Sequence, residues 1–250
     1  MAITAPLITS HYDPNFGDLR QSLQGPDSEH IFGTDNFGRD IFTRVLFGAR
    51  ISAVIAMVAV LIGIFIGVPL GLVSGFYGGY MDNFIMRAID IMLSFPRMLL
   101  AMLLTTILGI GLQTLIIALG VVSIPNFARQ VRGAVLTEVE EEYVQASISI
   151  GNSDFRTMFV HILPNVTAPI IIQASFNMAT CILMAGGLSF LGIGVTPPTP
   201  EWGAMLAGGR KYLRIAPYLV LYPGLILAMV VLGLNLLGDT LREIFDPRMK

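Results

Sequence analysis

The sequence predicts an all-α protein, a polytopic bundle of helices that cross a membrane. Of its 250 residues, 54% are hydrophobic and only 13% are charged, whereas a soluble domain carries about 25% charged residues. The apolar residues are also grouped into blocks of roughly 20 residues, which is the length that a helix needs to cross a bilayer. These two observations argue against an ordinary soluble fold.

Five apolar blocks are expected to be spans, and they divide the chain. They cover about 52–75, 84–108, 112–127, 166–190 and 216–237. The second and third should form a hairpin, because Gly109 to Gly111 lie between them. We therefore divide the chain into an N-terminal segment, 1–50, and a transmembrane domain, 51–250, which contains a long polar loop, 129–164. Lys and Arg are shared evenly between the two sides, so they do not orient the spans.

The residues just before the first span have an amphipathic pattern. Ile41, Val45 and Ala49 share one helical face, and Asp40 and Arg44 lie away from it. This pattern predicts a helix that lies in the membrane interface.

Within the first span, glycine recurs every four residues, at Gly63, Gly67, Gly71 and Gly75. Such a stripe lets another helix approach closely. Helix packing is the favoured interpretation, and a hinge is the alternative.

Charge is scarce in the blocks. Asp82, Arg87 and Asp90 lie at the beginning of the second block, where ion pairs or contacts with the interface are expected. Arg97 lies deeper and follows Pro96. An ionisable group inside a membrane is a functional candidate by default, so Arg97 is a candidate for lining a transport pathway.

Composition also limits the chemistry. The net charge is −2 and no basic run is present, so nothing points to nucleic acid. Cys181 is the one cysteine, which leaves no internal disulfide and no cysteine cluster for a metal. The two lysines, Lys211 and Lys250, are not in a phosphate-loop context. We therefore expect no enzyme activity and no bound cofactor in this chain.

The longest polar stretch, 129–164, has the signals of two helices joined by a tight turn. Thr137 and Glu140 have the spacing of a capping box, which predicts a helix beginning there. Gly151 is placed to end that helix in a left-handed conformation. Ser153 or Asp154 can cap a second short helix, which Pro164 closes.

The same stretch resembles the signature of the permeases of bacterial ATP-binding-cassette importers: Glu-Ala-Ala, three residues, Gly, nine residues, Ile-x-Leu-Pro. That signature falls on Gln145, Ala146, Ser147, Gly151, His161, Leu163 and Pro164. The spacing is intact. Gln replaces Glu, Ser replaces the second Ala, and His replaces Ile.

Three further stretches are similar to the dipeptide, oligopeptide and nickel permease subfamily, and the resemblance runs from about Tyr12 to Arg248. They cover 33–52, 189–203 and 235–247. Members of the subfamily usually have one more span ahead of the segment that matches Ala5 to Leu7. The family's first span is therefore expected to be missing here.

The resemblance implies a type I importer permease in the bacterial inner membrane, with 129–164 in the cytoplasm. Its partners would be a second, homologous permease, ATPase subunits that bind ATP and Mg²⁺, and an extracytoplasmic solute-binding protein. The N-terminal segment and the 197–202 loop would then lie outside. Peptides, a nickel complex or a related small solute remain open as cargo. The alternative is a secondary transporter or channel driven by an ion gradient.

The resemblance also indicates which residues would be functional. Those expected to couple the chain to an ATPase are Glu142, Tyr143, Gln145, Ala146, Ser147, Gly151, Asp154, Arg156, His161, Leu163 and Pro164. Candidates for the pathway or a receptor contact are Arg97, Pro198, Glu201 and Trp202. A merely rigid loop at 197–202 is the alternative for the last three.

Overall fold

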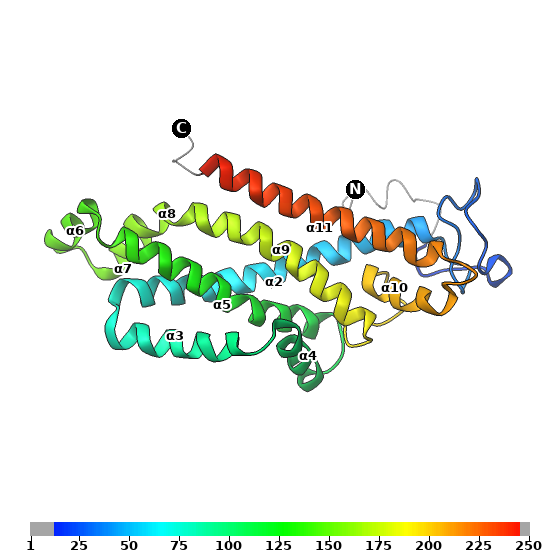
Figure 1. Cartoon of the computed structure of the whole chain (residues 1–250), viewed down its shortest axis with the longest axis horizontal. Coiled ribbons are helices and arrows are strands. Elements are labelled where there is room, and N and C mark those ends of the chain that lie inside the picture. The colour runs from blue at the N-terminus through cyan, green and yellow to red at the C-terminus, as the bar shows by residue number, and fades with distance from the viewer. Residues whose placement is uncertain (1–12, 246–250) are drawn as a thin grey trace.

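The computed structural model describes residues 13–245, and those residues form an elongated bundle of helices (Figure 1). In chain order the elements are η1 (Leu19–Gln21), α2 (Ile41–Tyr77), α3 (Gly79–Ser94), α4 (Arg97–Leu108), α5 (Leu112–Glu138), α6 (Glu142–Ser149), α7 (Asp154–Arg156), η2 (Thr157–Ile162), α8 (Leu163–Asn165), α9 (Thr167–Phe190), α10 (Trp202–Gly209), η3 (Arg210–Tyr212) and α11 (Tyr218–Phe245). Figure 1 shows α6 and α7 at one end, with α10 and residues 13–40 at the other.

The expected number of spans agrees with the helices that the structure describes. Four of them, α2, α5, α9 and α11, are long and apolar enough to cross a membrane, and α3 with α4 can make a fifth, bent span. Burial is greatest in α5, where 61% of the most apolar window lies inside the fold, and smallest in α11, with 17%. Helix α5 is therefore the centre of the bundle.

The prediction of a separate interfacial helix before the first span is wrong. Residues 41–77 form one continuous helix, α2. Neither Arg50 nor Ile51 breaks a helix, so the chain has no reason to turn there. Ile41 and Val45 are buried against Ala216 and Leu219 instead of facing lipid.

The second predicted span is not a straight helix. It breaks at Phe95 and Pro96, and α3 and α4 meet at an angle of 91°. Proline favours an extended conformation in the residue before it, and Phe95 has φ −91° and ψ 138°. The break therefore follows from local backbone chemistry.

The glycine stripe of α2 lies directly against α5, which confirms the packing interpretation. A Cβ on Gly67 would lie 2.7 Å from the carbonyl oxygen of Ile124, and one on Gly71 would lie 2.6 Å from that of Ala128. Contacts this short leave no room for a side chain. The two backbones can approach closely only because these positions lack Cβ.

Candidate functional site

The 129–164 segment begins inside α5 and not at a new helix. Helix α5 continues to Glu138, and α6 begins at Glu142 with Glu141 as its N-cap. The predicted helix start at Thr137 is therefore wrong. The last turns of α5 are held in place by Val135, which is completely buried and packs against Gly75. Tertiary packing thus overrides the capping pattern.

The glycine turn is confirmed. Gly151 has φ +81°, a conformation that costs little only for glycine. The amide of Asn152 donates to the carbonyl of Ser147 (3.2 Å), and the amide of Gly151 donates to that of Ile148 (3.0 Å). These two bonds form a complete Schellman motif. Ser153 then caps α7 by accepting from the amide of Arg156, so Ser153 is the cap and not Asp154.

Ser147 holds the two sides of this turn together by hydrogen bonds. Its side chain is buried, its Oγ lies 3.1 Å from the Thr157 hydroxyl, and it accepts from Asn152 Nδ2 at 3.0 Å. Val144, one turn earlier, is also buried. The hydroxyl at this buried position makes hydrogen bonds that alanine could not make.

Tyr143 joins three elements. Its hydroxyl donates to the Glu138 carboxylate at the end of α5 and accepts from Asn165 Nδ2 of α8 at 2.9 Å. Burial, followed by the hydrogen bond to Glu138, raises the pKa of Tyr143 to about 12. The phenol therefore stays protonated and remains a donor at physiological pH.

The other predicted coupling residues lie on the same module. Gln145 Nε2 donates to the Val139 carbonyl at 2.8 Å, and Asp154 accepts from the Tyr77 hydroxyl at 3.0 Å. Exposed at the surface are Glu142, Ala146, Arg156 and Pro164, while His161 and Leu163 are half-buried. Helices α6 to α8 thus bring all eleven together, and their role in coupling stays a prediction.

Sequence reasoning missed an apolar surface on this module. It is formed by Ile148, Ile150, Phe155 and Val160, of which Ile150 and Phe155 are 78% and 69% exposed. Phe155 stacks on Phe159 with ring centroids 4.5 Å apart. The signal was present in the sequence as apolar residues beside the turn, in a segment too polar overall to be a span. Such exposed side chains at a helix end are suited to a protein partner.

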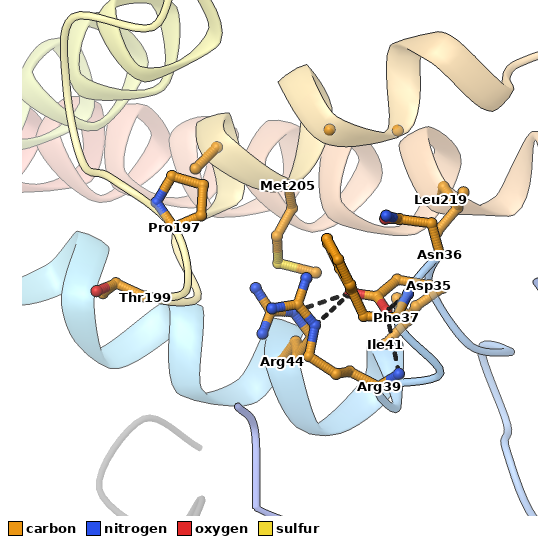
Figure 2. Close-up of a pocket in the computed structure, with 13 residues that line it drawn as sticks. Asp35, Asn36, Phe37, Arg39, Ile41, Arg44, Pro197, Thr199, Met205 and Leu219 are labelled. Atoms are coloured by element: carbon orange, nitrogen blue, oxygen red, sulfur yellow. Dashed lines mark hydrogen bonds and ion pairs between the residues drawn. The ribbon is translucent and has the colours of Figure 1, made fainter. Parts of the chain in front are cut away.

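At the opposite end, Asp35 organises the N-terminal segment. It accepts from the amides of Phe37 and Arg39 at 2.8 and 3.0 Å, and from Arg39 Nε at 2.7 Å. Arg44 Nε of α2 lies 3.8 Å from the same carboxylate. Figure 2 shows both guanidinium groups beside Asp35, with Pro197 of the 197–202 loop nearby.

The 197–202 loop is anchored by its last two residues. The Trp202 indole is buried against Gly48 and donates to the Val45 carbonyl at 3.0 Å. Glu201 is buried and caps α10 by accepting from two backbone amides at 2.9 Å. Both side chains pack inside the fold, which favours the rigid-loop interpretation for them. Pro198 is exposed, and its role in a receptor contact stays a prediction.

Two of the charged residues at the start of the second block, Asp82 and Asp90, form the expected ion pairs, both with arginines of α5. Arg132 Nη2 lies 2.7 Å from Asp82, and Arg129 Nη2 lies 2.5 Å from Asp90. Arg97 differs, since its Nη2 donates to the side-chain oxygen of Asn126 at 2.7 Å. Nothing in the sequence pattern pointed to Asn126, because the contact depends on the bend at Pro96.

Comparison with known proteins identifies the family. The model described as "Binding-protein-dependent transport system inner membrane component" matches residues 67–250. The dipeptide transport system permease protein of Alkalihalophilus pseudofirmus is 47% identical over 252 residues, which cover 100% of this chain and 82% of the relative. The glutathione transport system permease protein of Salmonella paratyphi A is 45% identical over 250 residues, with the same coverage.

Solved structures agree on the fold. A chain of the methionine ABC transporter MetNI, in inward-facing conformations, superposes with a TM-score of 0.65 at 21% identity, covering 81% of this chain and 97% of that one. A chain of an amino acid ABC transporter superposes with a TM-score of 0.63 at 14% identity, covering 82% and 95%.

The all-α transmembrane fold and the inner-membrane location are therefore confirmed. The chain belongs to the family of inner-membrane components of binding-protein-dependent transport systems, and it is a permease subunit of that family.

Proposed function

We propose that this permease subunit imports peptides or a peptide-like solute such as glutathione, driven by ATP hydrolysis on partner subunits. The relatives named for dipeptide and glutathione transport support this cargo, since they align over the whole chain. Neither lysine of the sequence lies in a phosphate-loop context. ATP and Mg²⁺ would therefore act on the ATPase partner, and this chain would supply part of the pathway.

The partners proposed are a second permease subunit, two ATPase subunits and an extracytoplasmic solute-binding protein. The family description itself refers to a binding protein. The 129–164 segment would face the cytoplasm and contact the ATPase, while the N-terminal segment and the 197–202 loop would face the binding protein.

One observation supports the coupling role above the others: the exposed apolar side chains of Ile150 and Phe155 flank a turn whose backbone is closed by a Schellman motif. A rigid turn can transmit force in both directions, because it does not bend when a partner pushes on it. The apolar side chains give that partner a surface to bury. An ATPase that closes on nucleotide would then move α6 and, through Tyr143 and Glu138, the end of α5.

Copurification tests this proposal with a matched pair of variants. Ile150→Glu places a charge on the proposed ATPase contact, whereas Ile215→Glu places one on a similarly exposed isoleucine, 72% against 78%, in the connection between η3 and α11. We expect the first variant to lose the ATPase subunits on gentle solubilisation and the second to retain them. Equal retention would contradict the proposed contact. A wild-type chain that purifies alone and moves solute down an ion gradient would support a secondary transporter instead.

A further inference from the structure

The break between α3 and α4 leaves a helix N-terminus on the side of the bundle, where residues 94–99 are all exposed in this subunit. Helix α4 is 12 residues long, its N-cap is Pro96, and no side chain caps it. Its first backbone hydrogen bond is made by the amide of Leu100 to the Pro96 carbonyl. The amides before Leu100, together with the helix dipole, favour a negative charge at this position.

The first residue of α4 adds a positive charge at the same place. Arg97 has no carboxylate within ion-pairing distance among residues 13–245, whereas Arg129 and Arg132 of α5 each have one. The bond that Arg97 makes is to the neutral Asn126 side chain at 2.7 Å. Asn126 lies near the middle of α5. A cation at that depth without a counter-ion is costly, so a role for the charge is expected.

A buried amide points to the same spot from a third helix. Asn177, near the middle of α9, is 3% exposed, and its Nδ2 has no hydrogen-bond partner within the described part of the chain. Asn177 lines a cavity of about 10 Å³ together with Arg97 and Asn126, which is room for a group the size of one water or one carboxylate oxygen. A buried donor without a partner costs free energy, so a group that accepts from it would be bound favourably.

A larger cavity adjoins this spot. Its volume is about 360 Å³, within the range of sites for small ligands. Its lining residues are Leu93, Arg97, Pro125, Asn126, Arg129, Gln130 and Gln173. No carboxylate is among them, and three side-chain amides offer both hydrogen-bond donors and acceptors. The peptide groups of a bound solute need both donors and acceptors. A carboxylate from a neighbouring helix would need donors alone, so it would leave the acceptor oxygens of these amides without partners.

We propose that Arg97, Asn126 and Asn177, at the N-terminus of α4, bind the free carboxylate of the transported solute midway across the membrane. A guanidinium group holds a carboxylate through two parallel hydrogen bonds. The flanking amides contact the peptide groups that follow it. This inference depends on the proposed import of peptides. It adds the requirement that the solute has a free carboxylate, which the membrane subunit itself recognises.

The experiment compares a dipeptide with its C-terminal amide in proteoliposomes that contain the complete transporter. Each peptide is supplied on saturated binding protein, so that selection by the binding protein does not enter the comparison. We expect Arg97→Gln to slow ATP-dependent uptake of the free acid by about tenfold, the scale of one charged hydrogen-bond pair, and to slow the amide by less than about twofold. Asn177→Leu, which is similar in size, should slow the free acid by about threefold.

Arg129→Gln is the matched control, because Arg129 lines the same cavity but is already paired with Asp90. It should change the uptake of both peptides by the same factor. Equal losses of acid and amide in Arg97→Gln would overturn the proposal. So would dissociation of that variant from the second permease, which would assign Arg97 to a contact between subunits. If the wild-type transporter takes up neither peptide with ATP, the proposed function fails first, and the two failures are thus distinguishable.

Discussion

The end of the bundle that holds residues 13–40 and α10 and the end that holds α6 and α7, in the 129–164 segment, are built differently (Figure 1). At the first, charged and aromatic side chains are buried: Asp35 and Arg44 form an ion pair, and Trp202 is 1% exposed. At the second, Ile150 and Phe155 point their apolar side chains into solvent, and α6 buries little more than Val144 and Ser147. One end completes its own packing, and the other leaves apolar surface for a partner.

The two ends owe their rigidity to different kinds of contact. The 197–202 loop and α2 are joined by the Trp202–Val45 hydrogen bond, which spans 157 residues of sequence. In the 129–164 segment the contacts that shape α6 and α7 are mainly local, namely a Schellman turn, a cap and the Tyr143 bridge, beside one long-range hydrogen bond from Tyr77 to Asp154. Long-range packing resists displacement of one end, whereas local bonds keep the other end rigid as a small unit that can move as a whole.

The largest effect is expected at the packed end. Trp202→Ala removes a fully buried side chain and its hydrogen bond to Val45, and should destabilise the subunit by about 3–5 kcal/mol. Thermal unfolding in detergent measures the loss. The control is Thr196→Ala, next to the same loop, whose side chain is exposed and which should cost less than about 0.5 kcal/mol. Equal effects would show that the loop is not anchored through Trp202.

The next effect is expected at the glycine turn. Gly151→Val forces a β-branched residue to φ +81°, which should cost about 1–2 kcal/mol locally. Because the turn is at the surface, membrane insertion should be normal, while ATP-driven transport should fall by roughly tenfold. Gly133→Val is the control, since a Cβ there meets nothing within 4 Å and φ is not positive. Normal transport in both variants would argue against the coupling role.

These two ends also differ in how well the sequence predicts them. The turn at Gly151 and the cap of α7 depend on neighbouring residues, so local chemistry was enough to place the turn and to limit the cap to Ser153 or Asp154, of which the structure has Ser153. Spans over α9 and α11 were similarly clear from their apolar length. The capping box at Thr137 failed, because burial of Val135 carries α5 past it.

Tertiary packing accounts for what the sequence could not predict. Helix α10 contains three glycines in eight residues, a poor helix former, and is held by the cap at Glu201 and the burial of Trp202. The contact between Arg97 and Asn126 requires the 91° bend of α3 against α4, and Pro96 indicates a break without giving its angle.

A smaller effect is expected from Tyr143→Phe, which removes the bridge between α5, α6 and α8. Losing these two hydrogen bonds, both at the surface, should together cost about 1 kcal/mol and speed amide exchange in α6 by roughly fivefold. The effect should be the same from pH 6 to 9, because the pKa of Tyr143 is raised to about 12. Tyr80→Phe, at a residue 98% exposed, should leave α6 exchange unchanged. Unchanged exchange in Tyr143→Phe would show that α6 does not depend on the bridge.

The smallest effect concerns pH at the packed end. Burial raises the pKa of the Glu201 carboxyl above its ordinary value, although the amides of Gly203 and Ala204 oppose the shift. A carboxyl with a raised folded-state pKa binds its proton more tightly in the folded protein. The stability that this gives is fully present below the unfolded pKa of about 4.3 and is lost as pH rises through the folded pKa.

The thermal unfolding temperature of the wild type should therefore fall as the pH rises above about 4.3. Glu201→Gln cannot ionise, so its unfolding temperature should change less over the same pH range. The 129–164 segment supplies the control. Glu142 is exposed in α6, so Glu142→Gln should leave the slope as it is in the wild type. An identical slope in Glu201→Gln would mean that the carboxyl is hydrated in the folded protein, and that the packed end is more open to water than its burial indicates.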